Sequence, residues 1–143
     1  MKNKKTVLVL GGYGNFGKRI CESLSVRSDI HLIVAGRYED RAIVCCDDLI
    51  ANGANCTVAA SVVDINSDNF REKLAIQTPD IVIHTAGPFQ GQDYRVANTC
   101  IEIGCHYIDL ADDRRFVCNF KKLAKLAKDK NVIAISGASS VPG

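Results

Sequence analysis

Residues 6–17, Thr-Val-Leu-Val-Leu-Gly-Gly-Tyr-Gly-Asn-Phe-Gly, decide the fold of this chain. Residues 6–10 form a short apolar run rich in β-branched side chains, which is typical of a buried parallel strand. Gly12, Gly14 and Gly17 follow with the spacing G-x-G-x-x-G, and the sequence from Asn15 onward predicts a helix. A strand, a glycine turn and a helix in this order predict a dinucleotide-binding unit.

Each of the three glycines has a physical role in such a unit. Gly12 would allow the tight turn, Gly14 would let the backbone approach a pyrophosphate, and Gly17 would let the helix pack closely on the strand. The free N–H groups and the positive dipole end of the helix would then hold the phosphates. The alternative is a glycine-rich turn that binds no ligand.

Length and composition indicate one globular domain. The chain has 143 residues, of which 47% are hydrophobic and 24% charged, as in an ordinary soluble domain. A net charge of +2 is too small to indicate a surface that binds nucleic acid. No apolar run is long enough to span a bilayer, and residues 6–10 are too short for the apolar part of a signal peptide. We therefore expect a cytoplasmic protein with no nucleic-acid or membrane partner.

The cysteines support this compartment. Seven cysteines, an odd number, occur without a C-x-x-C pair, so free buried thiols are expected rather than disulfides. Cys100, Cys105 and His106 are conceivable metal ligands, but their spacing matches no usual zinc pattern. No metal site is predicted.

Apolar runs and helical periodicity alternate along the chain. Helices are predicted over 15–26, from Glu39 to the Asn52-Gly53 pair, over 67–76 and 92–103, and from a cap at Asp112 or Asp113 to about residue 130. Strands are predicted over 6–10, 30–35, 56–60, 80–85, 106–110 and 131–135. Such alternation gives an α/β fold, a doubly wound parallel sheet (Rossmann) with helices on both faces. The expected strand order is 3-2-1-4-5-6, with the ligand crevice above strands 1 and 4.

Arg37 discriminates between cofactors. An NAD site usually has an acidic residue at the end of strand 2, which binds the ribose 2′-hydroxyl. Here that place holds Gly36-Arg37, and Arg41 follows one helical turn later. A guanidinium suits a 2′-phosphate, so NADP is favoured over NAD, and S-adenosylmethionine is disfavoured. The alternative is a solvated surface arginine.

Two further segments are expected at the crevice. Asp64 follows strand 3 and would either reach the adenine edge or cap the next segment. Residues 85–89, Thr-Ala-Gly-Pro-Phe, leave strand 4. Small residues there would let backbone amides approach the ribose or nicotinamide; the alternative is a plain turn.

The sequence gives only weak evidence for catalytic residues. Tyr107 and Asp109 share one face of a strand and would either act together or form a structural pair. His84 would be a proton donor or, as we favour, a packed histidine. Short-chain dehydrogenases need Tyr-x-x-x-Lys, and none of the four tyrosines here is followed by a lysine at that spacing.

Five segments together resemble a known family. They are VLGGYGNFG at 9–17, AGR at 35–37, TAGPF at 85–89, HYIDLADD at 106–113 and GASSVPG at 137–143. In this order they resemble the NADP-binding N-terminal domain of the saccharopine dehydrogenase-like family. Together with the glycine motif, the resemblance implies the following cofactor contacts: Gly12, Tyr13, Gly14, Asn15, Phe16, Gly17, Arg37, Asp64, Ala86, Gly87 and Pro88.

The resemblance also implies an activity. That family transfers hydride between NADP(H) and a substrate, typically at a C–N bond of an amino acid adduct, and binds the substrate with a second, C-terminal domain. Residues 1–143 would then be the N-terminal Rossmann domain of a longer oxidoreductase, not catalytically complete alone. Its exposed crevice edge would permit a homodimer. The alternative is a non-catalytic NADP-binding sensor or protein-interaction module.

Overall fold

A computed structural model of the chain describes residues 4–86 and 93–138. Helices and strands alternate along the chain, as predicted. The elements are β1 (Lys5–Leu10), α1 (Asn15–Leu24), β2 (Ile30–Gly36), α2 (Glu39–Ala51), β3 (Thr57–Val62), α3 (Phe70–Ile76), β4 (Ile81–His84), α4 (Arg95–Ile103), β5 (His106–Asp109), α5 (Arg114–Asn119), the 3₁₀ helix η1 (Phe120–Leu123), α6 (Ala124–Asp129) and β6 (Ala134–Ile135).

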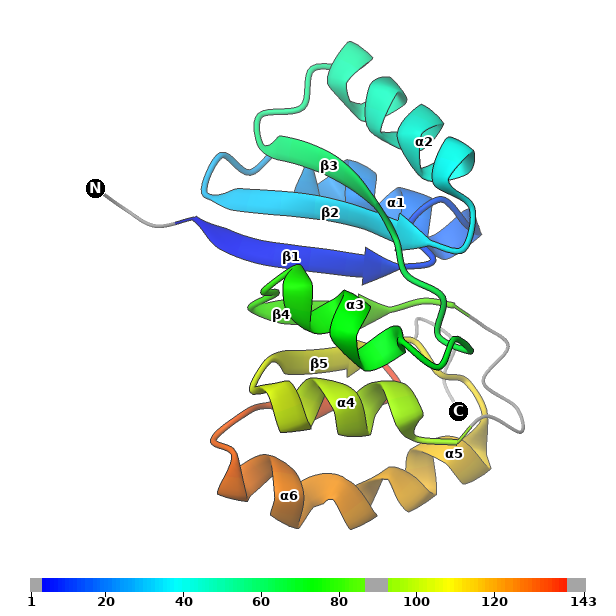
Figure 1. Cartoon of the computed structure of the whole chain (residues 1–143), viewed down its shortest axis with the longest axis vertical. Helices are drawn as coiled ribbons and strands as arrows, with labels where there is room; N and C mark the ends of the chain where they lie inside the picture. The colour runs from blue at the N-terminus through cyan, green and yellow to red at the C-terminus, as the bar shows by residue number, and fades with distance from the viewer. Residues whose placement is uncertain (1–3, 87–92, 139–143) are drawn as a thin grey trace.

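The strands form one six-stranded sheet in the order β3-β2-β1-β4-β5-β6 (Figure 1). Every neighbouring pair is parallel, and in the centre Leu8 pairs with Ile33 of β2 and Val82 of β4. β2 and β3 are therefore added on one side of β1, whereas β4, β5 and β6 are added on the other side. This confirms the predicted doubly wound fold, which places a ligand crevice at the carboxyl ends of β1 and β4.

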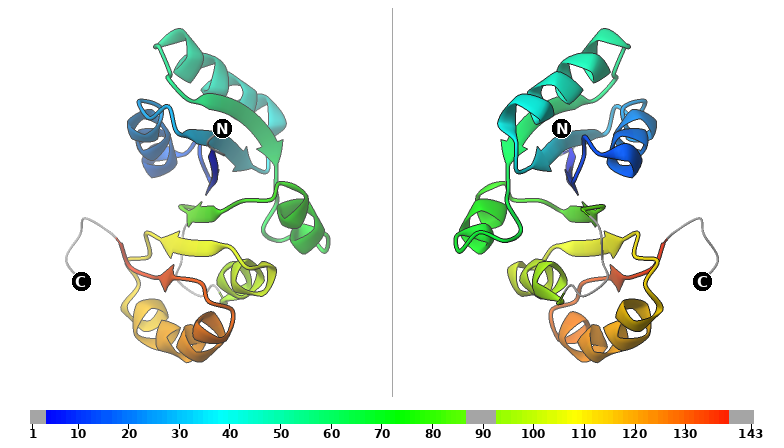
Figure 2. Two further views of the ribbon diagram at one scale, coloured as in Figure 1. Left: turned by 90° about the vertical axis from the view of Figure 1, so that its left-hand side faces the viewer. Right: turned by 90° about the vertical axis from the view of Figure 1, so that its right-hand side faces the viewer.

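The two faces of the sheet carry different cores. Figure 2 shows α1 on one side of the sheet and α3 and α4 on the other. The cluster beneath α1 and α2, here called the cysteine cluster, contains Val9, Leu32 and Val34 together with Cys21, Cys45, Cys46 and Cys56. The opposite cluster, here called the aromatic cluster, contains Leu8, Leu10 and Val82 together with Phe70, Tyr107, Phe116 and Phe120. Alternate side chains of β1 thus pack into the two clusters on opposite faces of the sheet.

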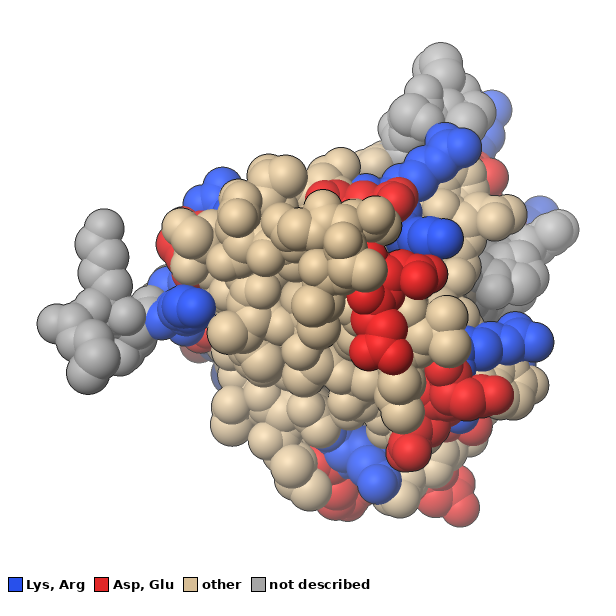
Figure 3. All heavy atoms as spheres, turned by 90° about the horizontal axis from the view of Figure 1, so that it is seen from above, with Lys and Arg blue, Asp and Glu red and all other residues tan. Residues whose placement is uncertain are grey.

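The outer surface over α2 and β3 is partly uncharged. Seen from above, acidic and basic side chains gather along one side of this surface and leave a broad uncharged area beside them (Figure 3). On α2, Ile43, Val44 and Ile50 are exposed. β3 is an edge strand of the sheet, and no residue of its sequence Thr-Val-Ala-Ala-Ser-Val is charged.

Two sequence expectations were wrong in detail. In the first predicted helix, Phe16, Ile20 and Leu24 have the spacing of one apolar stripe that faces the sheet. Ile20 and Leu24 do pack against the cysteine cluster, but Phe16 is 61% exposed. The fully buried residues of α1 are Gly17 and Cys21. The last predicted helix is interrupted by η1 between α5 and α6. Its cap is Asp113, whose carboxylate accepts a hydrogen bond from the Phe116 N–H at 2.9 Å.

Two other observations concern the cysteines and the length of the helices. Six cysteines in the described residues are free and buried, and Cys118 is free and exposed. Among the helices in residues 4–86 and 93–138, none is both long and apolar enough to cross a membrane.

Candidate functional site

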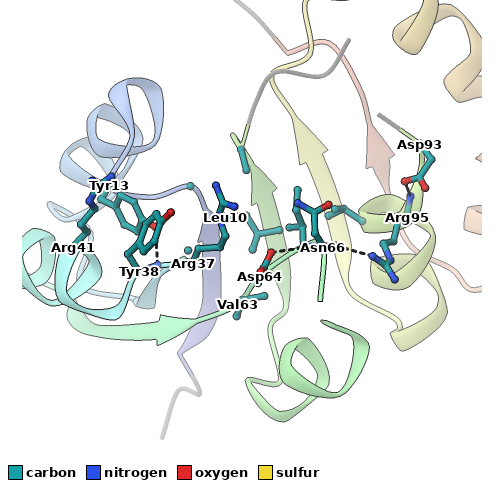
Figure 4. A pocket seen from close by; sticks show the side chains of 15 residues that line it. Leu10, Tyr13, Arg37, Tyr38, Arg41, Val63, Asp64, Asn66, Asp93 and Arg95 are labelled. Carbon is teal, nitrogen blue, oxygen red and sulfur yellow. Dashed lines mark hydrogen bonds between the residues drawn. The ribbon is translucent and has the colours of Figure 1, made fainter. Parts of the chain in front are cut away.

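A cavity of about 630 Å³ lies at the carboxyl ends of the strands (Figure 4). Tyr13, Arg37, Tyr38 and Arg41 lie at one end of it, and Asp93 and Arg95 at the other. The complete lining is Leu10, Gly11, Tyr13, Gly36, Arg37, Tyr38, Arg41, Val63, Asp64, Ile65, Asn66, Ala86, Asp93, Arg95 and Val96. The cavity therefore crosses from the β2–α2 turn to the start of α4, over the crevice that the topology predicts.

The glycine loop between β1 and α1 is tightly folded. The residue with a positive φ is Gly11, at +77°, and not Gly12, to which the sequence analysis assigned the tight turn. Gly12 is needed for space, since a Cβ there would lie 2.9 Å from Val34 Cγ1 and 3.1 Å from the Val9 carbonyl oxygen. A Cβ on Gly17 would overlap the Gly11 carbonyl oxygen. Gly17 therefore packs closely as predicted, but against the loop itself.

Gly14 begins α1. It is the N-cap in an extended conformation, and its N–H donates to the Gly11 carbonyl oxygen at 2.9 Å. The first N–H groups of a helix have no acceptor within the helix, and glycine offers no side chain to cap them. Such a helix start favours an anionic group.

A cluster of two arginines and two tyrosines forms one end of the cavity. The Arg37 guanidinium carbon lies 5.4 Å from the centre of the Tyr38 ring, and that of Arg41 lies 4.9 Å from it. The Tyr13 hydroxyl accepts a hydrogen bond from the Tyr38 N–H at 3.0 Å. Two positive charges thus share one aromatic ring at the end of β2, where a 2′-phosphate is expected.

The middle of the cavity holds Asp64 and Ala86. The Asp64 carboxylate accepts a hydrogen bond from the Asn66 N–H at 2.9 Å, which is the turn-capping role left open by the sequence. It also lines the cavity, so the two interpretations of Asp64 are compatible. Ala86 lines the cavity as well, and its N–H donates to His84 Nδ1 at 3.3 Å.

The predicted cofactor residues therefore fall into three groups. The structure brings Tyr13, Arg37, Asp64 and Ala86 into the cavity lining. Gly12, Gly14, Asn15, Phe16 and Gly17 form the adjoining loop and the first turn of α1, outside that lining. Gly87 and Pro88 lie outside the described residues.

Four polar residues of the cavity were missed. Tyr38 follows β2, Asn66 follows β3, Asp93 lies just before α4, and Arg95 begins α4. The Arg95 guanidinium donates to the Ile65 carbonyl oxygen at 3.1 Å, and its N–H donates to Asp93 at 3.0 Å. A sequence signal existed for Arg95, because the first residues of a helix after a parallel strand face the ligand edge.

Tyr107 and Asp109 make the contacts of a buried structural pair. Tyr107 is 1% and Asp109 0% exposed, and the Tyr107 hydroxyl donates to Asp109 Oδ2 at 2.6 Å. Asp109 also accepts hydrogen bonds from the Ala111 and Gly137 N–H groups and from the Ser136 hydroxyl. Burial, and then the neighbouring Asp109 charge, raise the pKa of Tyr107 above its ordinary value. His84 is buried at 1% exposure, which agrees with the packed histidine favoured from the sequence.

No group of three or more potential metal ligands occurs within residues 4–86 and 93–138. Cys100 and Cys105, two of the conceivable ligands, are both buried in the aromatic cluster.

The model of the saccharopine dehydrogenase NADP binding domain matches residues 7–135. The chain belongs to this family. The match confirms both the resemblance seen in the five sequence segments and the predicted cofactor, NADP. No curated protein sequence matches the chain.

Solved structures of similar fold include dehydrogenases and a reductase. A short chain dehydrogenase from Mycobacterium smegmatis has a TM-score of 0.75 at 17% identity, covering 99% of this chain and 82% of that chain. The citronellol catabolism dehydrogenase of Pseudomonas aeruginosa PAO1 has a TM-score of 0.70 at 15% identity, covering 92% and 73%. L-sorbose reductase from Gluconobacter frateurii, complexed with NADPH and L-sorbose, has a TM-score of 0.68 at 14% identity, covering 92% and 67%. These similarities show the shared fold, whereas this sequence lacks the Tyr-x-x-x-Lys pair of short-chain dehydrogenases.

Proposed function

We propose that NADP(H) binds across the cavity, with its 2′-phosphate at Arg37 and Arg41 and its pyrophosphate at the start of α1. The observation that carries this proposal is the pair of guanidinium groups over the Tyr38 ring, at the end of β2 and in the same cavity as Tyr13 of the glycine loop. A phosphate dianion needs such concentrated positive charge, and a bare ribose hydroxyl does not.

The chain's own residues fit this cofactor. The glycine loop leaves no room for side chains at Gly12 and Gly17, and it presents an uncapped helix start to an anion. Asp64, Asn66 and Val96 offer polar and apolar surface for the adenine in the middle of the cavity. Gly87 and Pro88, which the resemblance implies as further contacts, belong to the same proposal.

The proposed reaction is hydride transfer to or from a small substrate at a C–N bond of an amino acid adduct. Bound NADP(H) would supply the hydride. The described residues of this chain would bind the phosphates and orient the dinucleotide along the sheet edge. A further domain would bind the substrate, as the family resemblance implies. A cytoplasmic location, supported by the free buried thiols, and a homodimer are part of the same proposal.

The test is a calorimetric titration of the protein with NADPH and, separately, with NADH. NADPH is expected to bind at least about tenfold more tightly, a difference of about 1.4 kcal/mol. Arg37→Ala should remove this preference. Arg27→Ala is the matched control, because Arg27 pairs with Asp29 at 2.7 Å just before β2, at the opposite end of that strand. Equal affinities for the two nucleotides, or an Arg37→Ala variant that keeps the preference, would contradict the proposal.

A further inference from the structure

We infer that Tyr13 is a positioning residue that sets the preference for NADP over NAD, by holding the turn that carries Arg37. This inference rests on the proposed NADP site and assigns Tyr13 a role other than phosphate contact. Tyr13 belongs to the glycine loop, whereas Arg37 and Tyr38 follow β2. A hydrogen bond between these two segments therefore couples the phosphate loop to the residues that would bind the 2′-phosphate.

The contact is specific in its geometry. The Tyr13 hydroxyl accepts the Tyr38 N–H at 3.0 Å (Figure 4), a normal length for an N–H···O hydrogen bond. The Tyr13 ring occupies the space where Gly36 would carry a side chain, since a Cβ there would overlap Cε2 of the ring. The absence of a side chain at Gly36 thus admits the ring, and the ring places its hydroxyl at the following turn.

The hydrogen bond between Tyr13 and Tyr38 is one of several that hold the main chain on both sides of Arg37. Before Arg37, the Ala35 carbonyl accepts from the Gly11 N–H at 2.9 Å, and the Gly36 carbonyl accepts from the Val63 N–H at 2.9 Å. After Arg37, the Tyr38 N–H is held by Tyr13. Arg37 therefore lies between two fixed residues, and Tyr13 supplies the anchor on its far side.

Tyr38 in turn organises both arginines. Its ring lies beneath the guanidinium groups of Arg37 and Arg41, at 5.4 and 4.9 Å. Tyr38 is also the N-cap of α2, and its carbonyl accepts the Ala42 N–H at 3.2 Å. Fixing the Tyr38 backbone thus fixes the ring, the start of the helix that carries Arg41, and the turn that carries Arg37.

This arrangement affects the two cofactors differently. Arginine side chains lose much rotamer freedom when they are ordered, so a site in which they are ordered before binding holds its ligand more tightly. NADPH would use both guanidinium groups through its 2′-phosphate. NADH has no such phosphate, so its affinity should not depend on their order.

The experiment compares Tyr13→Phe with the wild type. The variant keeps the ring over Gly36 and loses only the hydroxyl. NADPH should bind about fivefold more weakly, as expected for one lost hydrogen bond, while the affinity for NADH stays within about twofold. The Tyr38 amide, followed by NMR hydrogen exchange in the absence of nucleotide, should exchange faster. Tyr94→Phe is the control: it removes a tyrosine hydroxyl bonded at 2.7 Å to the Phe116 carbonyl, outside the cavity lining, and should change neither measurement.

The outcomes separate this inference from the proposed function. If the wild type does not prefer NADPH, both are overturned. If Arg37→Ala removes the preference but Tyr13→Phe retains it, the NADP site stands and the role of Tyr13 is wrong. A Tyr13→Phe variant that weakens NADPH and NADH equally would show a general structural effect, and would also overturn the inference.

Discussion

Replacing Asp109 by alanine should cause a large loss of stability, because this buried carboxylate is the acceptor for four separate groups. The substitution removes the acceptors of the Tyr107 hydroxyl and the Ala111 N–H, both on buried residues, and of the half-buried Ser136 and Gly137. A buried donor left without a partner costs about 1–3 kcal/mol, whereas the half-buried donors can recover water. The expected loss in the free energy of unfolding is about 4 kcal/mol, a large part of the ~5–15 kcal/mol of a typical domain.

Asp109→Asn is the informative companion. Its amide oxygen can still accept from the Ala111 and Gly137 N–H groups, and its NH₂ can donate to the Tyr107 hydroxyl, which accepts as well as donates. The expected loss is only about 1 kcal/mol. Urea unfolding followed by far-UV circular dichroism measures both variants, with midpoints read at a shared slope. The reasoning is refuted if Asp109→Ala lies within about 1 kcal/mol of the wild type, or if the asparagine variant is as unstable as the alanine variant.

Three further predictions concern two glycines of the loop and the buried thiols. Gly17→Ala should lower the melting temperature and abolish NADPH binding, because its Cβ overlaps main-chain atoms of Gly11; thermal unfolding and calorimetry measure the two effects. Gly14→Ala should leave the melting temperature unchanged, because its Cβ would meet only the Gly11 carbonyl oxygen, at 3.3 Å. It should still weaken NADPH binding, because the added methyl group lies at the start of α1, where the pyrophosphate is proposed to bind. Unchanged binding would argue against phosphates at this position. Stability should also fall above about pH 8.5, the ordinary thiol pKa, because burial raises the pKa of Cys21 to about 12 and that of Cys46 to about 11. The unfolded chain then loses protons that the folded chain retains, so the free energy of unfolding falls by about 1.4 kcal/mol per pH unit for each thiol, or about 4 kcal/mol for the two by pH 10. Urea titrations at pH 8, 9 and 10 test this, and a constant midpoint would contradict it.

The strand order could be predicted because the sequence patterns that indicate it are local. Each central strand is a short apolar run, and the handedness of parallel crossovers leaves few ways to arrange such runs. The glycine spacing located the loop, but it could not tell which glycine takes the positive φ. That residue is Gly11, where a Cβ would lie 2.8 Å from Thr85 Oγ1 and 3.1 Å from the Ala86 nitrogen, both of which are far away in the sequence.

The parts that the sequence missed depend on three-dimensional contacts. The spacing of Phe116, Phe120 and Leu123 fits a continuous helix and an interrupted one equally well, so η1 was not predicted. Arg95 reaches the cavity because α4 begins beside the β3–α3 loop. The hydrogen bond from Tyr38 to Tyr13 joins residues 25 positions apart, and no periodicity indicates it.

The unequal chemistry of the two cores allows the two faces of the sheet to be followed separately during unfolding. Four of the buried thiols belong to the cysteine cluster, whereas the buried phenylalanines and Tyr107 belong to the aromatic cluster. The sequence contains no tryptophan, so near-ultraviolet circular dichroism is not dominated by a single indole. Alkylation of the four thiols in the cysteine cluster reports one face, and the aromatic signal reports the other. Coincident transitions would identify a single cooperative unit, and separated ones would show that one layer of helices detaches from the sheet before the other.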